Sequence, residues 1–198
     1  MSDGLIEALI VRTHATIGEH AGELTKLDQA IGDGDHGINM RRGFDAIHAD
    51  REAIAAMDYA DALHKAGMTL VMKVGGASGP LYGSLLMGMS KAAKRGEGIA
   101  GQLGEGIASI RARGKSDVGA KTMLDVLVPV HRALAEGRVA ELRDIADEAL
   151  EHTRPMQATR GRASFLGERS IGHLDPGATS ARHLLHAVLD VLDARGGA

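Results

Sequence analysis

Cysteine is absent from this sequence of 198 residues, and aromatic side chains are rare. Without cysteine there are no disulfides, no thiolate metal ligands and no cysteine nucleophile. Aromatic residues make up 2% of the chain. β-Sandwiches, β-barrels and stacking platforms for single-stranded nucleic acid use more of them. We therefore expect a core of aliphatic and methionine side chains, which suits packed helices.

An excess of one charge and a long apolar run are also lacking. The formal net charge is −3 and no block of lysine or arginine occurs, so nothing indicates sequence-independent binding to nucleic acid. No apolar run approaches the roughly 20 residues that cross a bilayer. The acidic start, Met1 to Gly4, is unlike a signal peptide. These absences predict a cytoplasmic protein with no nucleic-acid partner and no membrane partner.

What the chain does have is apolar residues at helical spacing along most of its length. One stripe combines Leu184, Leu185, Val188 and Leu192. The most strand-like stretch, residues 69–74, lies inside a helical pattern, and no linker divides the chain. We expect a single all-α domain over residues 1–198, built from eight amphipathic helices. Their expected ranges are 2–24, 37–56, 59–74, 79–94, 99–113, 123–136, 138–158 and 177–194.

Three carboxylates, those of Asp28, Asp33 and Asp35, lie within eight residues and are separated by glycines. Such carboxylates repel one another unless a cation lies between them. Oxygen ligands without cysteine favour a hard cation such as magnesium, manganese or calcium. A solvated acidic turn is the alternative. A calcium-binding EF-hand loop is excluded, because Phe44 stands where that loop needs glutamate.

Residues 32–37 and 114–122 each come close to a known phosphate-binding motif. The first has the spacing of a dinucleotide-binding glycine fingerprint, but no strand precedes it. The second differs from a P-loop, because Ala120 is inserted before Lys121 and the preceding segment is helical in pattern. We interpret residues 114–122 as a flexible, basic loop between helices, and contact with a nucleotide stays open.

A further loop, residues 161–177, contains Arg162 and Arg169 among several glycines. The planar guanidinium group of arginine matches phosphate oxygens, although pairing with nearby acids is equally open at this stage.

Glycine-rich loops precede expected helices near Gly37, Ser78 and Asp175. A helix N-terminus offers free amides and partial positive charge to phosphate. If these three ends meet near the acidic cluster, they form a site for a magnesium-bound polyphosphate. His36 is the best histidine candidate, because it adjoins Asp35 at a helix start. We interpret the histidines inside helical segments as surface or core residues.

Taken together, these stretches resemble the ADP-binding L subunit of bacterial dihydroxyacetone kinases. The matching signatures are Leu27-Asp28 with residues 31–39, residues 75–83, residues 119–123 and residues 161–177. The resemblance implies an eight-helix antiparallel barrel with ADP or ATP at one end. It also implies that Asp28, Asp33 and Asp35 ligate two magnesium ions that bridge to the diphosphate. No catalytic residue of this chain's own is required.

Carried over by position, the resemblance implies a set of ADP contacts drawn from four loops. These are His36, Gly37, Ile38, Asn39, Ala77, Ser78, Gly114, Met123, Arg162, Asp175, Pro176 and Gly177. The family also implies two partner chains. A K-type subunit holds dihydroxyacetone, and an M-type phosphocarrier of the phosphoenolpyruvate-dependent phosphotransferase system supplies the phosphoryl group through a phosphohistidine.

Other functions stay open on the sequence. The chain could serve an ATP-dependent kinase for another short ketose such as erythrulose, because the sugar site lies on another chain. It could also be a non-catalytic nucleotide-binding regulator, or a module with a structural calcium ion.

Overall fold

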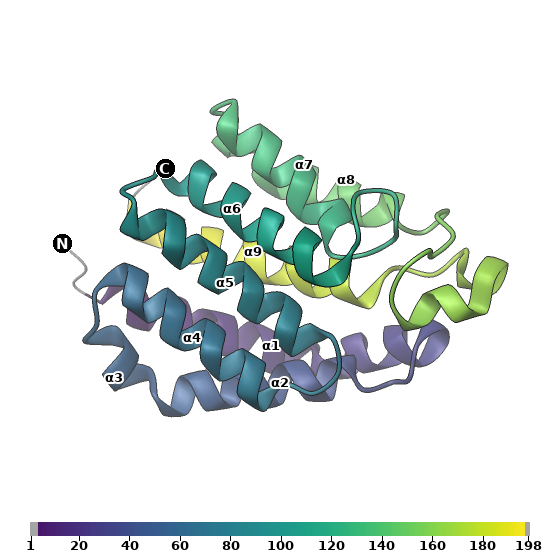
Figure 1. Cartoon of the computed structure of the whole chain (residues 1–198), viewed down its shortest axis with the longest axis horizontal. Coiled ribbons are helices and arrows are strands. Elements are labelled where there is room, and N and C mark those ends of the chain that lie inside the picture. The colour runs from purple at the N-terminus through teal and green to yellow at the C-terminus, as the bar shows by residue number, and fades with distance from the viewer. Residues whose placement is uncertain (1–3, 197–198) are drawn as a thin grey trace.

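The computed structural model describes residues 4–196, and the part of the chain that it describes is helical without strands (Figure 1). The all-α prediction is therefore confirmed. The elements are α1 (Leu5–Ile31), α2 (His36–Ala49), α3 (Arg51–Ala55), α4 (Tyr59–Lys73), α5 (Ser78–Lys94), α6 (Ile99–Gly114), α7 (Leu124–Ala135), η1 (Val139–Glu141), α8 (Leu142–His152), η2 (Arg162–Ser170) and α9 (Pro176–Ala194).

The long helices form a circuit of neighbours. Contacts run from α1 to α2, then to α4, α5, α6, α7 and α8, and α9 packs against both α8 and α1. This circuit is compatible with the closed barrel that the family resemblance implies. The loop at residues 32–35, the loop at residues 74–77 and η2 all lie at one end of the molecule (Figure 1).

Aliphatic side chains fill the space between the helices, as the scarcity of aromatic residues predicts. Ile17 and Leu24 of α1, Leu70 of α4 and Leu124 of α7 are almost completely buried in one core. Each such side chain stabilises the fold by roughly 1.5–3 kcal/mol through removal of apolar surface from water. Among the described residues, no helix is long and apolar enough to cross a membrane.

Glycines allow three of these helices to pack closely. A Cβ added to Gly67 of α4 would lie 2.9 Å from the carbonyl oxygen of Gly83 in α5. A Cβ added to Gly88 of α5 would lie 2.8 Å from the carbonyl oxygen of Glu105 in α6. Larger residues would push these helices apart, so α4, α5 and α6 pack as a unit at glycine contacts.

Several helix boundaries differ from the sequence prediction. The first helix runs to Ile31 rather than residue 24, because Leu24, Asp28 and Ile31 continue its buried face. The predicted helix 37–56 is divided into α2 and α3 at Asp50. The predicted helix 138–158 is replaced by η1 and α8, which ends at His152. Over residues 4–196 the structure has nine α-helices, not eight.

Candidate metal centre and its surroundings

Asp28 lies in the last turn of α1, and Asp33 and Asp35 lie in the short connection to α2. One carboxylate oxygen from each of the three residues lies within 4.8 Å of the others. Glycine at position 32 leaves room for the Asp28 carboxylate, because an added Cβ would meet Asp28 Oδ1 and lie 3.0 Å from the Asp28 carbonyl oxygen. Gly34 adopts φ +76°, a left-handed conformation that favours glycine. The three carboxylates thus lie close together, as the sequence predicts.

The carboxylate of Asp28 also fastens the start of α2. Its Oδ2 accepts hydrogen bonds from the backbone N–H groups of Asp35 at 2.8 Å and His36 at 3.0 Å. These two amides belong to a helix N-terminus, where N–H groups have no partner within the helix. Asp28 therefore holds the backbone of Asp35 in place while it contributes an oxygen to the cluster.

Arg162 of η2 forms an ion pair with Asp33, with 3.1 Å between Nε and Oδ2. Both side chains are largely exposed, so the pair contributes at most about 1 kcal/mol of stability. The structure thus shows the pairing with a nearby acid that the sequence left open, and it places η2 beside the acidic cluster. The donor set of three carboxylates fits a hard divalent cation such as magnesium.

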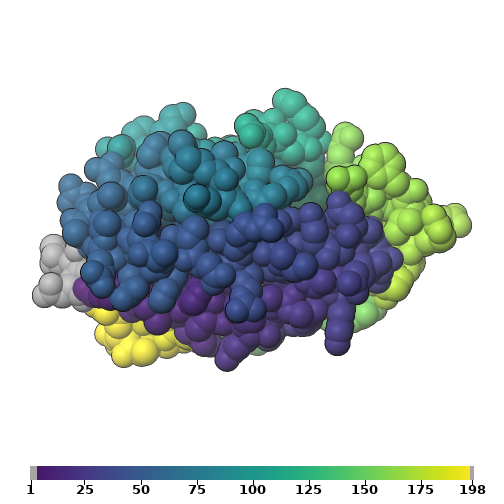
Figure 2. All heavy atoms as spheres, turned by 90° about the horizontal axis from the view of Figure 1, so that it is seen from below, coloured from purple at the N-terminus to yellow at the C-terminus, as the bar shows by residue number. Residues whose placement is uncertain are grey.

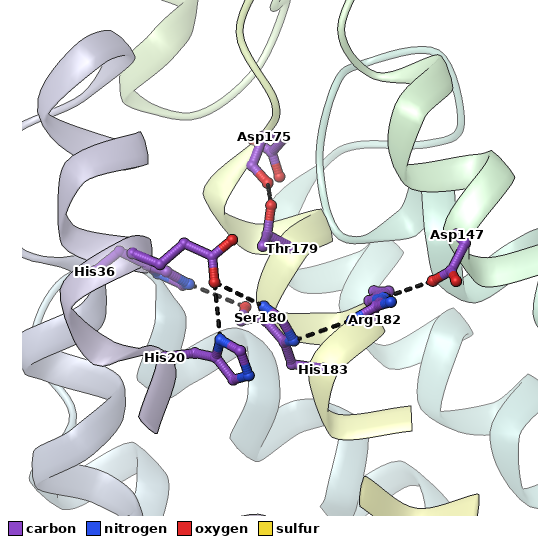
Figure 3. A network of polar contacts seen from close by, with 9 residues as sticks. His20, His36, Asp147, Asp175, Thr179, Ser180, Arg182 and His183 are labelled. Atoms are coloured by element: carbon purple, nitrogen blue, oxygen red, sulfur yellow. Dashed lines mark hydrogen bonds and ion pairs between the residues drawn. The ribbon is translucent and has the colours of Figure 1, made fainter. Parts of the chain in front are cut away.

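His36 is buried and bridges two other helices through its imidazole ring. Its Nδ1 lies 2.8 Å from Ser78 Oγ of α5, and its Nε2 lies 2.9 Å from Ser180 Oγ of α9. Tyr82 O–H lies 2.7 Å from the same Ser180 hydroxyl. Burial lowers the pKa of His36 despite the charges of Asp28 and Asp35. The ring is therefore neutral and joins α2, α5 and α9 at the site. Its contact with Ser180 of α9 is seen in Figure 3.

The third of the expected helix starts, near Asp175, is the N-terminus of α9. Asp175 Oδ2 accepts the N–H of Ala178 at 2.6 Å and Pro176 occupies the first turn, which is the arrangement that an Asp-Pro pair favours at a helix start. Asp175 also accepts a hydrogen bond from the Thr179 hydroxyl through its carbonyl oxygen (Figure 3). Burial, with Asp125 nearby, raises the pKa of Asp175 to about 7.

Most of the remaining predicted ADP contacts lie at or beside the starts of α2, α5 and α9. Asn39 faces the loop before α5, where a Cβ on Gly75 would lie 2.9 Å from its Oδ1. Ala77 is the residue before α5, and Gly177 lies against Met123, with 3.5 Å from an added Cβ to the Met123 nitrogen. Gly37 packs under α1, because an added Cβ would meet the carbonyl oxygen of Ala21.

Ile38 and Gly114 are the two remaining predicted contacts. Ile38 is 56% exposed on α2 and lines a groove with Lys26 and Arg41. Gly114 ends α6 beside Leu81 of α5. Their contacts with a nucleotide stay predictions.

A model of the DAK2 domain matches residues 30–190 of the chain. The chain belongs to the DAK2 domain family. The ADP-binding subunit DhaL of PEP-dependent dihydroxyacetone kinase 1 from Listeria innocua is 49% identical over 177 residues, covering 87% of this chain and 88% of the relative. The DhaL subunit from Escherichia coli is 42% identical, covering 82% of this chain and 84% of the relative. The resemblance drawn from the motifs is thus confirmed.

The fold of this DAK2 domain also occurs in a solved structure. The dihydroxyacetone kinase of C. freundii in complex with AMP-PNP and Mg²⁺ superposes with a TM-score of 0.79 at 22% sequence identity. The match covers 94% of this chain and 34% of that one, so the DAK2 domain spans about a third of the larger kinase chain. At this level of identity, the comparison shows the shared fold.

Lys121 was interpreted wrongly from the sequence. The P-loop-like stretch is not a flexible basic loop at this position, because the Lys121 side chain is only 1% exposed. Its Nζ donates hydrogen bonds to the carbonyl oxygens of Met156 and Ser170. Asp125 accepts the N–H groups of Gly119 and Thr122, both at 2.6 Å. Thr122 and Asp125 have the spacing of a capping box, which is a local sequence signal for an ordered helix start here.

Ser180 and Tyr82 were missed as site residues. Tyr82 belongs to a signature that the family resemblance rests on, but its hydroxyl role depends on α9 lying beside α5. Ser180 lies one turn after Gly177, on the face of α9 that turns toward His36 (Figure 3). A hydroxyl at this spacing from a helix start is the only local signal, and many helices share it.

Proposed function

We propose that this DAK2 domain is the nucleotide-holding subunit of a dihydroxyacetone kinase that works with the phosphotransferase system. The main observation in support is that Asp28, Asp33 and Asp35 lie close together beside the N-terminus of α2. The names of the Listeria and Escherichia relatives support this function, and both are aligned over most of their own length. A relay of this kind operates in the cytoplasm, which is the location that we propose.

The acidic cluster is the proposed metal site. Asp28, Asp33 and Asp35 would hold two magnesium ions, and the diphosphate of ADP would lie on the far side of the metals. When bound, magnesium and ADP supply charge neutralisation and the phosphoryl acceptor. Without the metals, three carboxylates and a diphosphate would repel one another.

Three helix ends would bind and orient the nucleotide. His36, Ser78 and Gly177 stand at the starts of α2, α5 and α9, where the partial positive charge of a helix N-terminus favours phosphate. The neutral ring of His36 ties both helices together and holds the two ends at a constant separation. Arg162 beside Asp33 adds a cation at the mouth of the site.

The full proposed contact set is the one carried over from the family. It comprises His36, Gly37, Ile38, Asn39, Ala77, Ser78, Gly114, Met123, Arg162, Asp175, Pro176 and Gly177. None of these residues needs to act as a nucleophile, because phosphoryl transfer depends mainly on position and charge.

The partners are a K-type chain that holds dihydroxyacetone and an M-type chain with a phosphohistidine. The test is reconstitution: the purified DAK2 domain with ADP is combined with K-type and M-type subunits and a phosphoenolpyruvate-driven phosphoryl source. We expect dihydroxyacetone phosphate only when all chains are present. Rapid phosphorylation of dihydroxyacetone by the DAK2 domain alone with ATP would contradict the proposal. Erythrulose in place of dihydroxyacetone tests the alternative substrate.

A further inference from the structure

A second group of possible metal ligands lies outside the acidic cluster, between α1 and α9. It consists of His20 and Glu23 from α1 and His183 from α9. One ligand atom from each residue lies within 4.8 Å of the others. Figure 3 shows His20 and His183 side by side. The proposed nucleotide site makes no use of these three side chains.

The two imidazole rings share one carboxylate oxygen. Glu23 Oε2 lies 2.8 Å from His20 Nδ1 and 3.2 Å from His183 Nε2. In a tetrahedral site with metal–ligand distances of about 2.0–2.2 Å, ligand atoms are roughly 3.3 Å apart. The distance from Glu23 Oε2 to each ring nitrogen is therefore close to the spacing that a metal would require.

Small movements complete such a site. The rings are stacked, with centroids 3.7 Å apart and an angle of 16° between their planes. Both rings must therefore tilt for their nitrogen lone pairs to converge, and His20 has room for this because it lies at the surface. Arg182 Nη1, 3.4 Å from His183 Nδ1, must move away from that nitrogen. Asp147, which accepts a hydrogen bond from Arg182 Nε, would keep the guanidinium group paired after that movement (Figure 3).

The ligand types decide which cation fits. Two imidazole nitrogens and one carboxylate suit zinc, cobalt or nickel, whereas magnesium prefers oxygen ligands alone. Three protein ligands leave a further position for water. The two clusters of this chain would thus select different metals. Asp28, Asp33 and Asp35 would bind a hard cation, and the cluster with the two histidines would bind a borderline cation.

We propose that His20, Glu23 and His183 form a binding site for a borderline divalent cation such as zinc. The ion would join α1 to α9. His183 lies one turn after Ser180, and Glu23 lies five residues before Asp28, so the joined segments are those that carry the proposed nucleotide site. Zinc would stabilise this corner of the fold whether or not nucleotide is bound.

The test is titration of the metal-stripped, tag-free protein with cobalt(II), which reports nitrogen ligands through its visible absorption. We expect one equivalent of cobalt to give a visible band, and zinc to displace it. His20→Gln and His183→Gln should each abolish the band. Because His20 is a surface residue, its variant should fold normally, and magnesium-dependent ADP binding should confirm this.

The chain offers a matched control. His14 and His48 are also stacked, with centroids 4.2 Å apart, and Asp45 accepts a bond from His14 at 2.8 Å. Among the described residues, His14, His48 and Asp45 do not bring three ligand atoms together as the proposed site does. His48→Gln should therefore leave the cobalt band unchanged. No band in the wild type, or a band that persists in both His20→Gln and His183→Gln, would overturn the proposal.

Discussion

At the scale of single residues, Asp28 links the fold to the site. Its Oδ2 accepts the amides of Asp35 and His36, while the same carboxyl group belongs to the acidic cluster. A charge that is fastened by two hydrogen bonds is held in place before any ligand arrives. This preorganisation reduces the entropy lost when a metal binds.

The buried carboxyl group of Asp175 should make stability depend on pH. Its pKa is raised from 3.8 to about 7, so the folded protein keeps a proton that the unfolded chain has lost between these values. The stabilisation is therefore complete below about pH 3.8 and is lost as the pH rises through about 7.

Asp175→Asn isolates this effect, because asparagine can still cap α9 but cannot titrate. We expect wild type to gain stability relative to Asp175→Asn as the pH falls from about 7.5 to about 5.5, by up to about 1.4 kcal/mol per pH unit. Denaturant unfolding in EDTA at several pH values measures this difference. A difference that is constant with pH would show that the carboxyl group does not titrate in this range.

At the scale of elements, glycine contacts between helices should control stability. Gly67→Ala places a methyl group 2.9 Å from the Gly83 carbonyl oxygen and should destabilise the protein by about 1–3 kcal/mol. Gly18→Ala in the exposed face of α1 meets nothing within 4 Å and should stabilise it by roughly 0.5–1 kcal/mol. Thermal melts of the two variants should shift in opposite directions. Equal shifts in the two melting temperatures would mean that α4 and α5 leave room for a methyl group at Gly67.

Lys121 fastens the segment that contains η2 to the start of α7. Lys121→Met removes the donor to the carbonyl oxygens of Met156 and Ser170. A buried carbonyl left without a partner costs about 1–3 kcal/mol. We expect a lower Tm and faster hydrogen exchange at the amides of residues 156–172, with α4 and α5 unaffected. Exchange that rises uniformly across the protein would indicate global destabilisation instead.

Local signals explain which elements the sequence predicted well. The start of α9 was predicted because Asp175 and Pro176 mark a helix start within two residues. The end of α1 was not, because its last turns are held by burial of Leu24 and Ile31 against other parts of the chain. The break at Asp50 between α2 and α3 has no glycine or proline to mark it.

At the scale of the whole molecule, the same distinction applies to the site. The acidic cluster was predictable because its three residues are close in sequence. The burial of Lys121 and the meeting of His20 with His183 were not, because each depends on segments far apart in the chain. Family resemblance supplied what local patterns lacked, namely the identity of the nucleotide.

The central claim is that metal and nucleotide bind to the DAK2 domain together. Asp35→Asn keeps the side-chain size but removes one charge from the cluster, so it should weaken the metal and therefore ADP. Asp193→Asn, at the other end of α9, removes the same charge far from the site and serves as control. A solvated acidic turn would behave in the opposite way, because relief of repulsion would stabilise Asp35→Asn slightly.

The most direct measurement is calorimetric titration of ADP with and without magnesium, on wild type, Asp35→Asn and Asp193→Asn. Bound ADP is first removed with EDTA. We expect tight binding only for wild type and Asp193→Asn in magnesium, and weak binding in every other case. An ADP affinity that is the same with and without magnesium, and the same in Asp35→Asn, would contradict the metal-bridged site.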